Sequence, residues 1–147
     1  MNAAKGLTHV SMKYVAAIAL VLAPIFLLAQ ENTEKPDSMP IHPGETLYVT
    51  FQRSGDSLTI AHAGKDVDKE AQVIFTMAPI KEIHGMSLKV ENKFDKNLHY
   101  KAEVRLLSNN KRANTSVVPV RAGKMSFESW PYMIEELALS EFELRGK

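Results

Sequence analysis

The chain of 147 residues has the composition of one small globular domain, because 45% of its residues are hydrophobic and 24% are charged. Its 18 basic and 17 acidic side chains nearly cancel, and they form no basic footprint of the kind that binds nucleic acid. The absence of cysteine excludes a disulfide framework, a thiolate metal site, a cysteine nucleophile and a lipid-modified cysteine.

Residues 1–29 have the three-part pattern of a secretory signal peptide. Two lysines precede an apolar run at Tyr14–Ala29, and the polar Gln30 follows it. A helix that spans a bilayer needs about 20 apolar residues, and Pro24 interrupts this shorter run. We therefore predict cleavage near Ala29, which leaves a periplasmic or secreted protein.

The alternative is that residues 1–29 stay as an uncleaved membrane anchor. The positive-inside rule then keeps the N-terminal lysines in the cytoplasm and places the rest of the chain in the periplasm. Contact with the membrane is expected only through residues 14–29 in that case.

Residues 30–44 contain three prolines and no hydrophobic periodicity, and this predicts a linker between the N-terminal segment and a folded domain at 45–147.

From residue 45 onward, apolar and polar side chains alternate in short segments that are separated by turn-forming residues. A period of two is typical of β-strands with one buried face. The segments predicted as strands are 46–53, 57–63, 71–77, 86–91, 98–107, 115–120, 125–130 and 136–144. Seven or eight short strands without an amphipathic helix predict an all-β fold, specifically an Ig-like antiparallel β-sandwich preceded by the N-terminal hydrophobic helix.

The stretch Met86–Leu107 has the clearest alternation and a polar turn at its centre. We predict a hairpin whose register pairs Glu91 with Lys101 and Lys89 with Glu103. The alternative, found in Ig-like folds, places the two strands in different sheets and joins them through the polar corner.

The last predicted strand changes its phase of alternation. Leu137 and Leu139 lie in one phase, and Phe142 and Leu144 lie in the other. A change of phase within a strand predicts a β-bulge, here near Ser140.

An aromatic cluster at Ser126–Ile134 is a candidate binding patch for a peptide, a glycan or a partner protein. Trp130 and Tyr132 lie in the phase opposite to Met125 and Phe127. If Met125 and Phe127 face the core, Trp130 and Tyr132 reach toward solvent or a neighbouring strand. The alternative is a buried Trp130 whose indole N–H donates a hydrogen bond to a carbonyl.

Histidine and methionine side chains are the candidate metal ligands, because a thioether beside an imidazole suits copper in an oxidising compartment. His84 and Met86 are two residues apart and would share one side of a strand. Further candidate ligands are His42, His62 and Met39. The alternative is that the methionines belong to the core and the histidines face solvent.

No motif for catalysis, zinc binding or calcium binding was found in the sequence. We therefore predict a non-catalytic binding or accessory module of the periplasm, with an unidentified protein or small ligand as its partner. Two alternatives are a periplasmic copper-binding or copper-delivery protein and a membrane-anchored accessory subunit of an envelope complex.

Overall fold

The computed structural model describes residues 37–146, which form nine antiparallel β-strands and one short 3₁₀ turn. The all-β prediction is confirmed, whereas the predicted signal peptide or anchor at 1–29 lies outside the described residues. No helix of the described part is long and apolar enough to cross a membrane. The elements are β1 (Met39–Ile41), β2 (Thr46–Ser54), β3 (Ser57–Gly64), β4 (Val73–Ile80), η1 (Lys81–Ile83), β5 (Gly85–Asn92), β6 (Asn97–Leu106), β7 (Arg112–Thr115), β8 (Met125–Trp130) and β9 (Ile134–Arg145).

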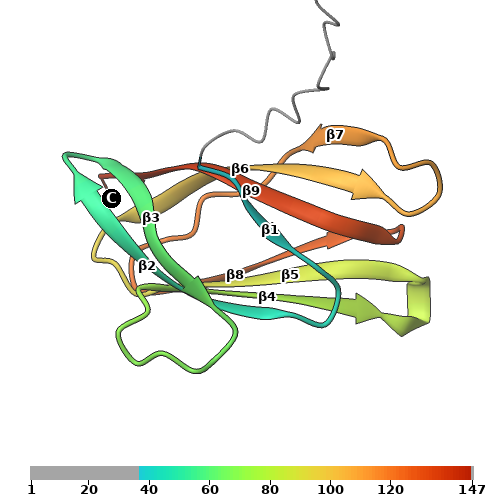
Figure 1. The fold of residues 1–147 in the computed structure, drawn as a ribbon, viewed down its shortest axis with the longest axis horizontal. Coiled ribbons are helices and arrows are strands. Elements are labelled where there is room, and N and C mark those ends of the chain that lie inside the picture. The colour runs from blue at the N-terminus through green and yellow to red at the C-terminus, as the bar shows by residue number, and fades with distance from the viewer. Residues whose placement is uncertain (1–36, 147) are drawn as a thin grey trace, which may run out of the picture. The chain divides into compact units, whose positions relative to one another are not determined.

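The strands form one curled sheet in the order β7-β6-β9-β3-β2-β4-β5-β8, and β1 also pairs with β9. Figure 1 shows β6, β7 and β9 on one side of the molecule and β2, β4, β5 and β8 on the other. The two parts are joined through β3 and β9, which share the single pair Ser57 and Glu143. The sheet therefore has two ends, β7 and β8.

The inner face of the curled sheet is a hydrophobic core in which aromatic rings from both parts meet. The ring of Phe75 on β4 lies 5.9 Å from that of Tyr100 on β6 and 6.1 Å from that of Phe142 on β9. Phe51 on β2 lies 5.0 Å from Phe142. These contacts join strands from both parts, so the core fixes the curl of the sheet.

The predicted hairpin between the strands of Met86–Leu107 is wrong, because these two strands do not pair with each other and lie apart in the one curled sheet. β5 lies between β4 and β8, while β6 lies between β7 and β9. The expected charge pairs do not form: Lys89 bonds Glu91 of its own strand, and Lys101 bonds Glu141.

The buried Asn92 explains why the chain leaves one part of the sheet for the other. Its side-chain amide donates hydrogen bonds to the carbonyls of Lys96, Val120 and Arg121 at 2.9, 3.0 and 3.2 Å. Its carbonyl accepts a hydrogen bond from the Phe94 N–H at 3.0 Å. One side chain thus satisfies the backbone of the corner, which does not close as a hairpin.

Two further sequence predictions are resolved at β9. The bulge near Ser140 is confirmed, because Glu141 has a φ of 53° and the register with β6 shifts there. Part of the predicted linker belongs to the sheet, since β1 pairs with β9 between Met39 and Leu139 and between Ile41 and Leu137. Met39 and Ile41 are buried, and their burial explains why a segment with Pro40 at its centre is held as a strand.

Candidate functional site

Strand β8 presents apolar side chains to solvent at one end of the sheet. Met125 is 57% exposed and Phe127 is 66% exposed, whereas Trp130 is only 6% exposed. Met125 and Phe127 therefore face solvent and not the core, and Trp130 on the other face of the strand is buried. An exposed phenylalanine on a terminal strand is unusual enough to mark a candidate interaction surface.

The backbone of β8 has one edge that faces away from β5. The Asn92 N–H donates to the Lys124 carbonyl at 2.9 Å, which makes these residues a hydrogen-bonded pair of the antiparallel ladder. Pairs of this kind alternate, so Met125, Phe127 and Ser129 direct their N–H and C=O groups away from β5. Within residues 37–146, no backbone hydrogen bond uses these groups. We call the side chains and free backbone groups of these three residues the β8 surface.

The inner side of β8 is held in place by polar contacts. The indole N–H of Trp130 donates to the Thr115 hydroxyl at 2.9 Å, and the Val118 N–H donates to the Glu128 carboxylate at 2.6 Å. Thr115 is the last residue of β7, and Val118 lies in the connection between β7 and β8. These two hydrogen bonds fix β8 without covering its outer face.

Two buried hydroxyl groups, those of Ser126 on β8 and Tyr100 on β6, have no hydrogen-bond partner among the described residues. Burial and, secondarily, the negative charge of Glu128 raise the pKa of Tyr100 well above its usual range. Tyr100 is therefore a neutral phenol near pH 7, and it is not a candidate base or nucleophile.

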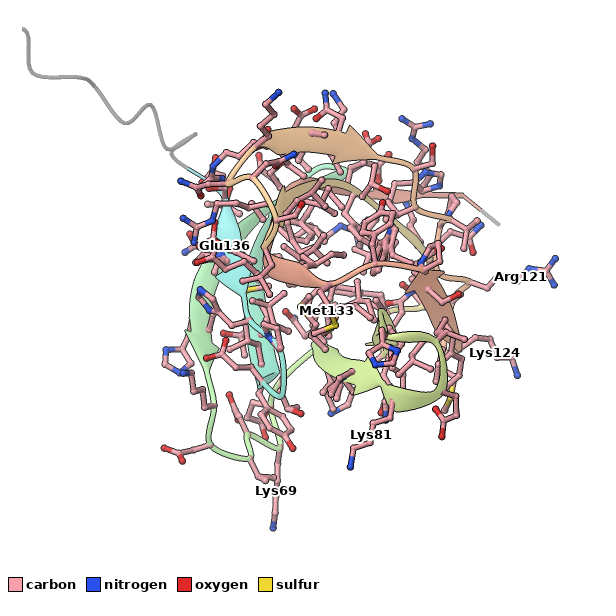
Figure 2. The ribbon with its side chains drawn as sticks, turned by 90° about the vertical axis from the view of Figure 1, so that its right-hand side faces the viewer. Lys69, Lys81, Arg121, Lys124, Met133 and Glu136 are labelled. Atoms are coloured by element: carbon pink, nitrogen blue, oxygen red, sulfur yellow. The ribbon has the colours of Figure 1, made fainter. Side chains whose placement is uncertain are left out.

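The two ends of β8 differ in character. Arg121 and Lys124 precede the strand, and Figure 2 shows both side chains extending into solvent in neighbouring positions. Neither forms an ion pair within the described part of the chain. Exposed Tyr132 and Met133 follow the strand. The turn before β8 is thus cationic, and the segment after β8 is apolar.

A second feature is a pair of adjoining hollows of about 330 Å³ each beside the β9 bulge. Both include Ser57, Glu141 and Phe142 in their walls. The basic side chains here are already bound, because Lys101 bonds Glu141 at 2.6 Å and Arg145 bonds Glu143. The two cations that line these hollows are thus neutralised by neighbouring carboxylates.

The candidate copper ligands occupy two different environments. Met86 and Met39 are core residues with exposed fractions of 0% and 5%. His84 and His62 are exposed, and the His42 ring lies 3.2 Å from a Glu45 oxygen. No group of three or more histidine or carboxylate side chains that could hold a metal ion occurs among residues 37–146. A copper site at these positions would require methionine to leave the core.

The candidate binding residues Trp130 and Tyr132 are likewise separated by their environments. Trp130 is buried, and its N–H donates to a hydroxyl instead of the carbonyl expected for a buried ring. Tyr132 is exposed, so only Tyr132 can touch a partner without rearrangement. Sequence reasoning included Phe127 in the aromatic cluster, but it selected Trp130 and Tyr132 as the contact residues on the condition that Met125 and Phe127 face the core. The signal that could have found them is the size of Trp130, the best candidate for burial in its strand.

Comparisons with protein-family models, with curated proteins and with solved structures found no match.

Proposed function

We propose that this protein is a non-catalytic binding module of the cell envelope that accepts an extended segment of a partner protein as an additional strand beside β8. One observation carries the proposal: exposed Met125 and Phe127 lie on a strand whose outer backbone groups are unpaired within the described residues. Free edges of this kind pair readily with another chain, and strand addition is a recurring mode of peptide recognition.

The ladder beside β8 supports this mode of binding. Phe127 lies opposite Lys89 of β5, and Met125 lies opposite Glu91. A partner strand would add a further row about 4.8 Å beyond β8, with side chains opposite Phe127 and Met125 about 5 Å away. Backbone hydrogen bonds would supply affinity, and the two apolar side chains would select apolar residues at alternate positions of the partner.

The export and the finer fold belong to the same proposal. The signal-like pattern of residues 1–29 supports a periplasmic location, whether the segment is cleaved or retained as an anchor. An Ig-like sandwich is supported by the passage of the chain from β5 to β6, which lie in opposite parts of the sheet. An edge strand of such a fold is a template for pairing with another chain, as proposed here for β8.

The test uses a fluorescein-labelled peptide of alternating threonine and valine, and fluorescence anisotropy measures its binding to the full chain. Phe127→Ser and Met125→Ser should each weaken binding about tenfold, because each removes an apolar contact of about 1.5 kcal/mol or more. Leu107→Ser is the matched control, since Leu107 is exposed but lies outside β8. Equal affinity of the wild-type and Phe127→Ser proteins would contradict the proposal.

A further inference from the structure

The charge distribution around β8 specifies the kind of segment that it binds, and this inference rests on the proposed function. Arg121 and Lys124 lie in the turn that leads into the strand. The Lys124 N–H donates to the Arg121 carbonyl at 3.1 Å, and the Gly123 N–H donates to the Phe94 carbonyl at 2.9 Å. Gly123 has a φ of 63°, a backbone conformation that favours glycine. The turn therefore holds both cations at the start of β8.

No acidic partner for these cations lies within the described part of the chain. Two carboxylates of the adjoining strands are bound elsewhere: Glu128 accepts the Val118 N–H, and Glu91 bonds Lys89. Two unpaired cations at a site of strand addition favour a partner with carboxylates. At the opposite end, Tyr132 and Met133 offer apolar surface without charge.

The direction of the partner strand follows from the ladder. Every pairing between the strands of residues 37–146 is antiparallel. Antiparallel addition lets Phe127 exchange both of its free backbone hydrogen bonds with one partner residue, and such pairing is slightly more stable than parallel pairing. An antiparallel partner places its C-terminal end beside the start of β8, where Arg121 and Lys124 lie.

We infer that the β8 surface binds an extended acidic segment that runs antiparallel to the strand, with aspartate or glutamate side chains at its C-terminal end and apolar residues before them. The carboxylates face Arg121 and Lys124, and the apolar residues contact Phe127 and Met125. The partner segment is thus apolar in its first part and acidic at its C-terminal end, and its apolar side chains lie on one of its two faces.

Three probe peptides of equal length test the inference: TVTVTVTEE, EETVTVTVT and TVTVTVTQQ. Each carries fluorescein at its N-terminus and an amide at its C-terminus, so that only side-chain carboxylates differ. At low salt TVTVTVTEE should bind about tenfold more tightly than TVTVTVTQQ, because each exposed ion pair increases the affinity by up to about fivefold. High salt should remove most of this difference. The peptide with its acids at the N-terminus should bind no more tightly than the glutamine peptide.

Charge reversal provides the second arm. The variant R121E/K124E should lose the preference for TVTVTVTEE and bind TVTVTVTKK more tightly instead. The control K69E/K111E makes the same change in net charge at exposed lysines outside both β8 and the turn that precedes it, and it should keep the wild-type preference. Retention of that preference by R121E/K124E would overturn the inference.

The remaining outcomes separate this inference from the proposed function. If the glutamate and glutamine peptides bind equally tightly and Phe127→Ser weakens both, the function stands and the acidic partner is wrong. If no peptide binds to the wild-type protein, the proposed function itself fails. If sedimentation shows a dimer that Phe127→Ser dissociates, and no peptide competes with it, a second copy of the chain occupies the surface and both proposals are overturned.

Discussion

The two terminal strands of the curled sheet, β7 and β8, differ in how their free edges are protected. A terminal strand exposes unpaired backbone groups, and proteins usually guard such an edge with charge, short length or proline. Strand β7 has only four residues, and its Arg112 bonds Glu103 at 3.3 Å and Glu136 at 2.9 Å. Strand β8 instead exposes Met125 and Phe127 on its outer face.

This difference indicates that the open edge at β8 is not a general property of the fold. The edge at β7 is protected by the short length of the strand and by a paired arginine. Since an unguarded apolar edge carries a risk of aggregation, its presence at β8 favours a partner that covers it.

The largest expected effect is the loss of the anchor beneath β8. Trp130→Ala should lower the free energy of unfolding by about 4 kcal/mol, because it empties a core site and removes the hydrogen bond to Thr115. Urea denaturation measures the change. Tyr132→Ala is the control and should cost less than about 1 kcal/mol, since Tyr132 is exposed. A stable Trp130→Ala protein that cannot bind the peptide would instead make Trp130 a partner contact.

The next effect concerns the seam between β5 and β8. A Cβ atom at Gly85 would lie 2.3 Å from the Trp130 carbonyl oxygen, a contact that forces the two strands apart. Gly85→Ala should therefore destabilise the protein by about 2–3 kcal/mol. Gly146→Ala is the control because a Cβ there meets nothing within 4 Å. Equal unfolding temperatures for the two variants would show that β8 is not held as described.

Exchanging the character of the two edges should change binding more than stability. Phe127→Lys gives β8 a charge like that of β7, and it should weaken binding of the threonine–valine peptide more than about tenfold. Its free energy of unfolding should stay within about 0.5 kcal/mol of the wild type, since the side chain is exposed. A variant that binds normally would mean that the apolar contact is not needed.

The converse change exposes the guarded edge. Arg112→Val removes the ion pairs of β7 with Glu103 and Glu136 and leaves an apolar side chain on a free edge. Self-association should then increase, as measured by sedimentation velocity at several protein concentrations. A strictly monomeric variant would show that the short length of β7 guards the edge without the arginine.

The smallest effect lies away from both edges, at Glu45. The hydrogen bond from Lys65 at 2.5 Å, with help from His42, lowers the pKa of Glu45 from about 4.5 to about 2. Because the folded pKa is the lower one, this contribution to stability is complete above about pH 4.5 and is lost as the pH falls toward 2.

Glu45→Gln should accordingly be less stable than the wild type by up to about 1 kcal/mol at pH 6. The two proteins should converge near pH 2, as followed by urea denaturation across the pH range. A stability difference that stays constant with pH would assign the effect of the substitution to something other than the carboxylate charge.

The alternation of side chains predicted most strands, since the period of two depends on local geometry alone. It also located the bulge near Ser140, where the phase of the apolar residues changes. The hairpin prediction failed because cross-strand charge pairing is not unique. Lys89 forms its ion pair with Glu91 of its own strand, and the buried amide of Asn92 holds the corner from which the chain passes to the opposite part of the sheet.

The candidate site was harder to predict, because alternation shows two faces of a strand without indicating which one is buried. In β8 the inner face contains Ser126 and Glu128, which the pattern alone would assign to solvent. The Glu128 carboxylate accepts a hydrogen bond from the Val118 N–H, and the Trp130 N–H donates one to the hydroxyl of Thr115, 15 residues earlier in the chain. Contacts between such distant segments depend on the tertiary fold and leave no local signal.

Hydrogen exchange at individual amides of β8 tests the central claim most directly. The Phe127 and Ser129 amides face the free edge and should exchange quickly in the protein alone, whereas the Ser126 and Glu128 amides, bonded to β5, should be protected. Addition of TVTVTVTEE should slow exchange at Phe127 and Ser129 and leave Ser126 and Glu128 unchanged. Binding of the peptide without new protection at Phe127 and Ser129 would contradict strand addition at β8.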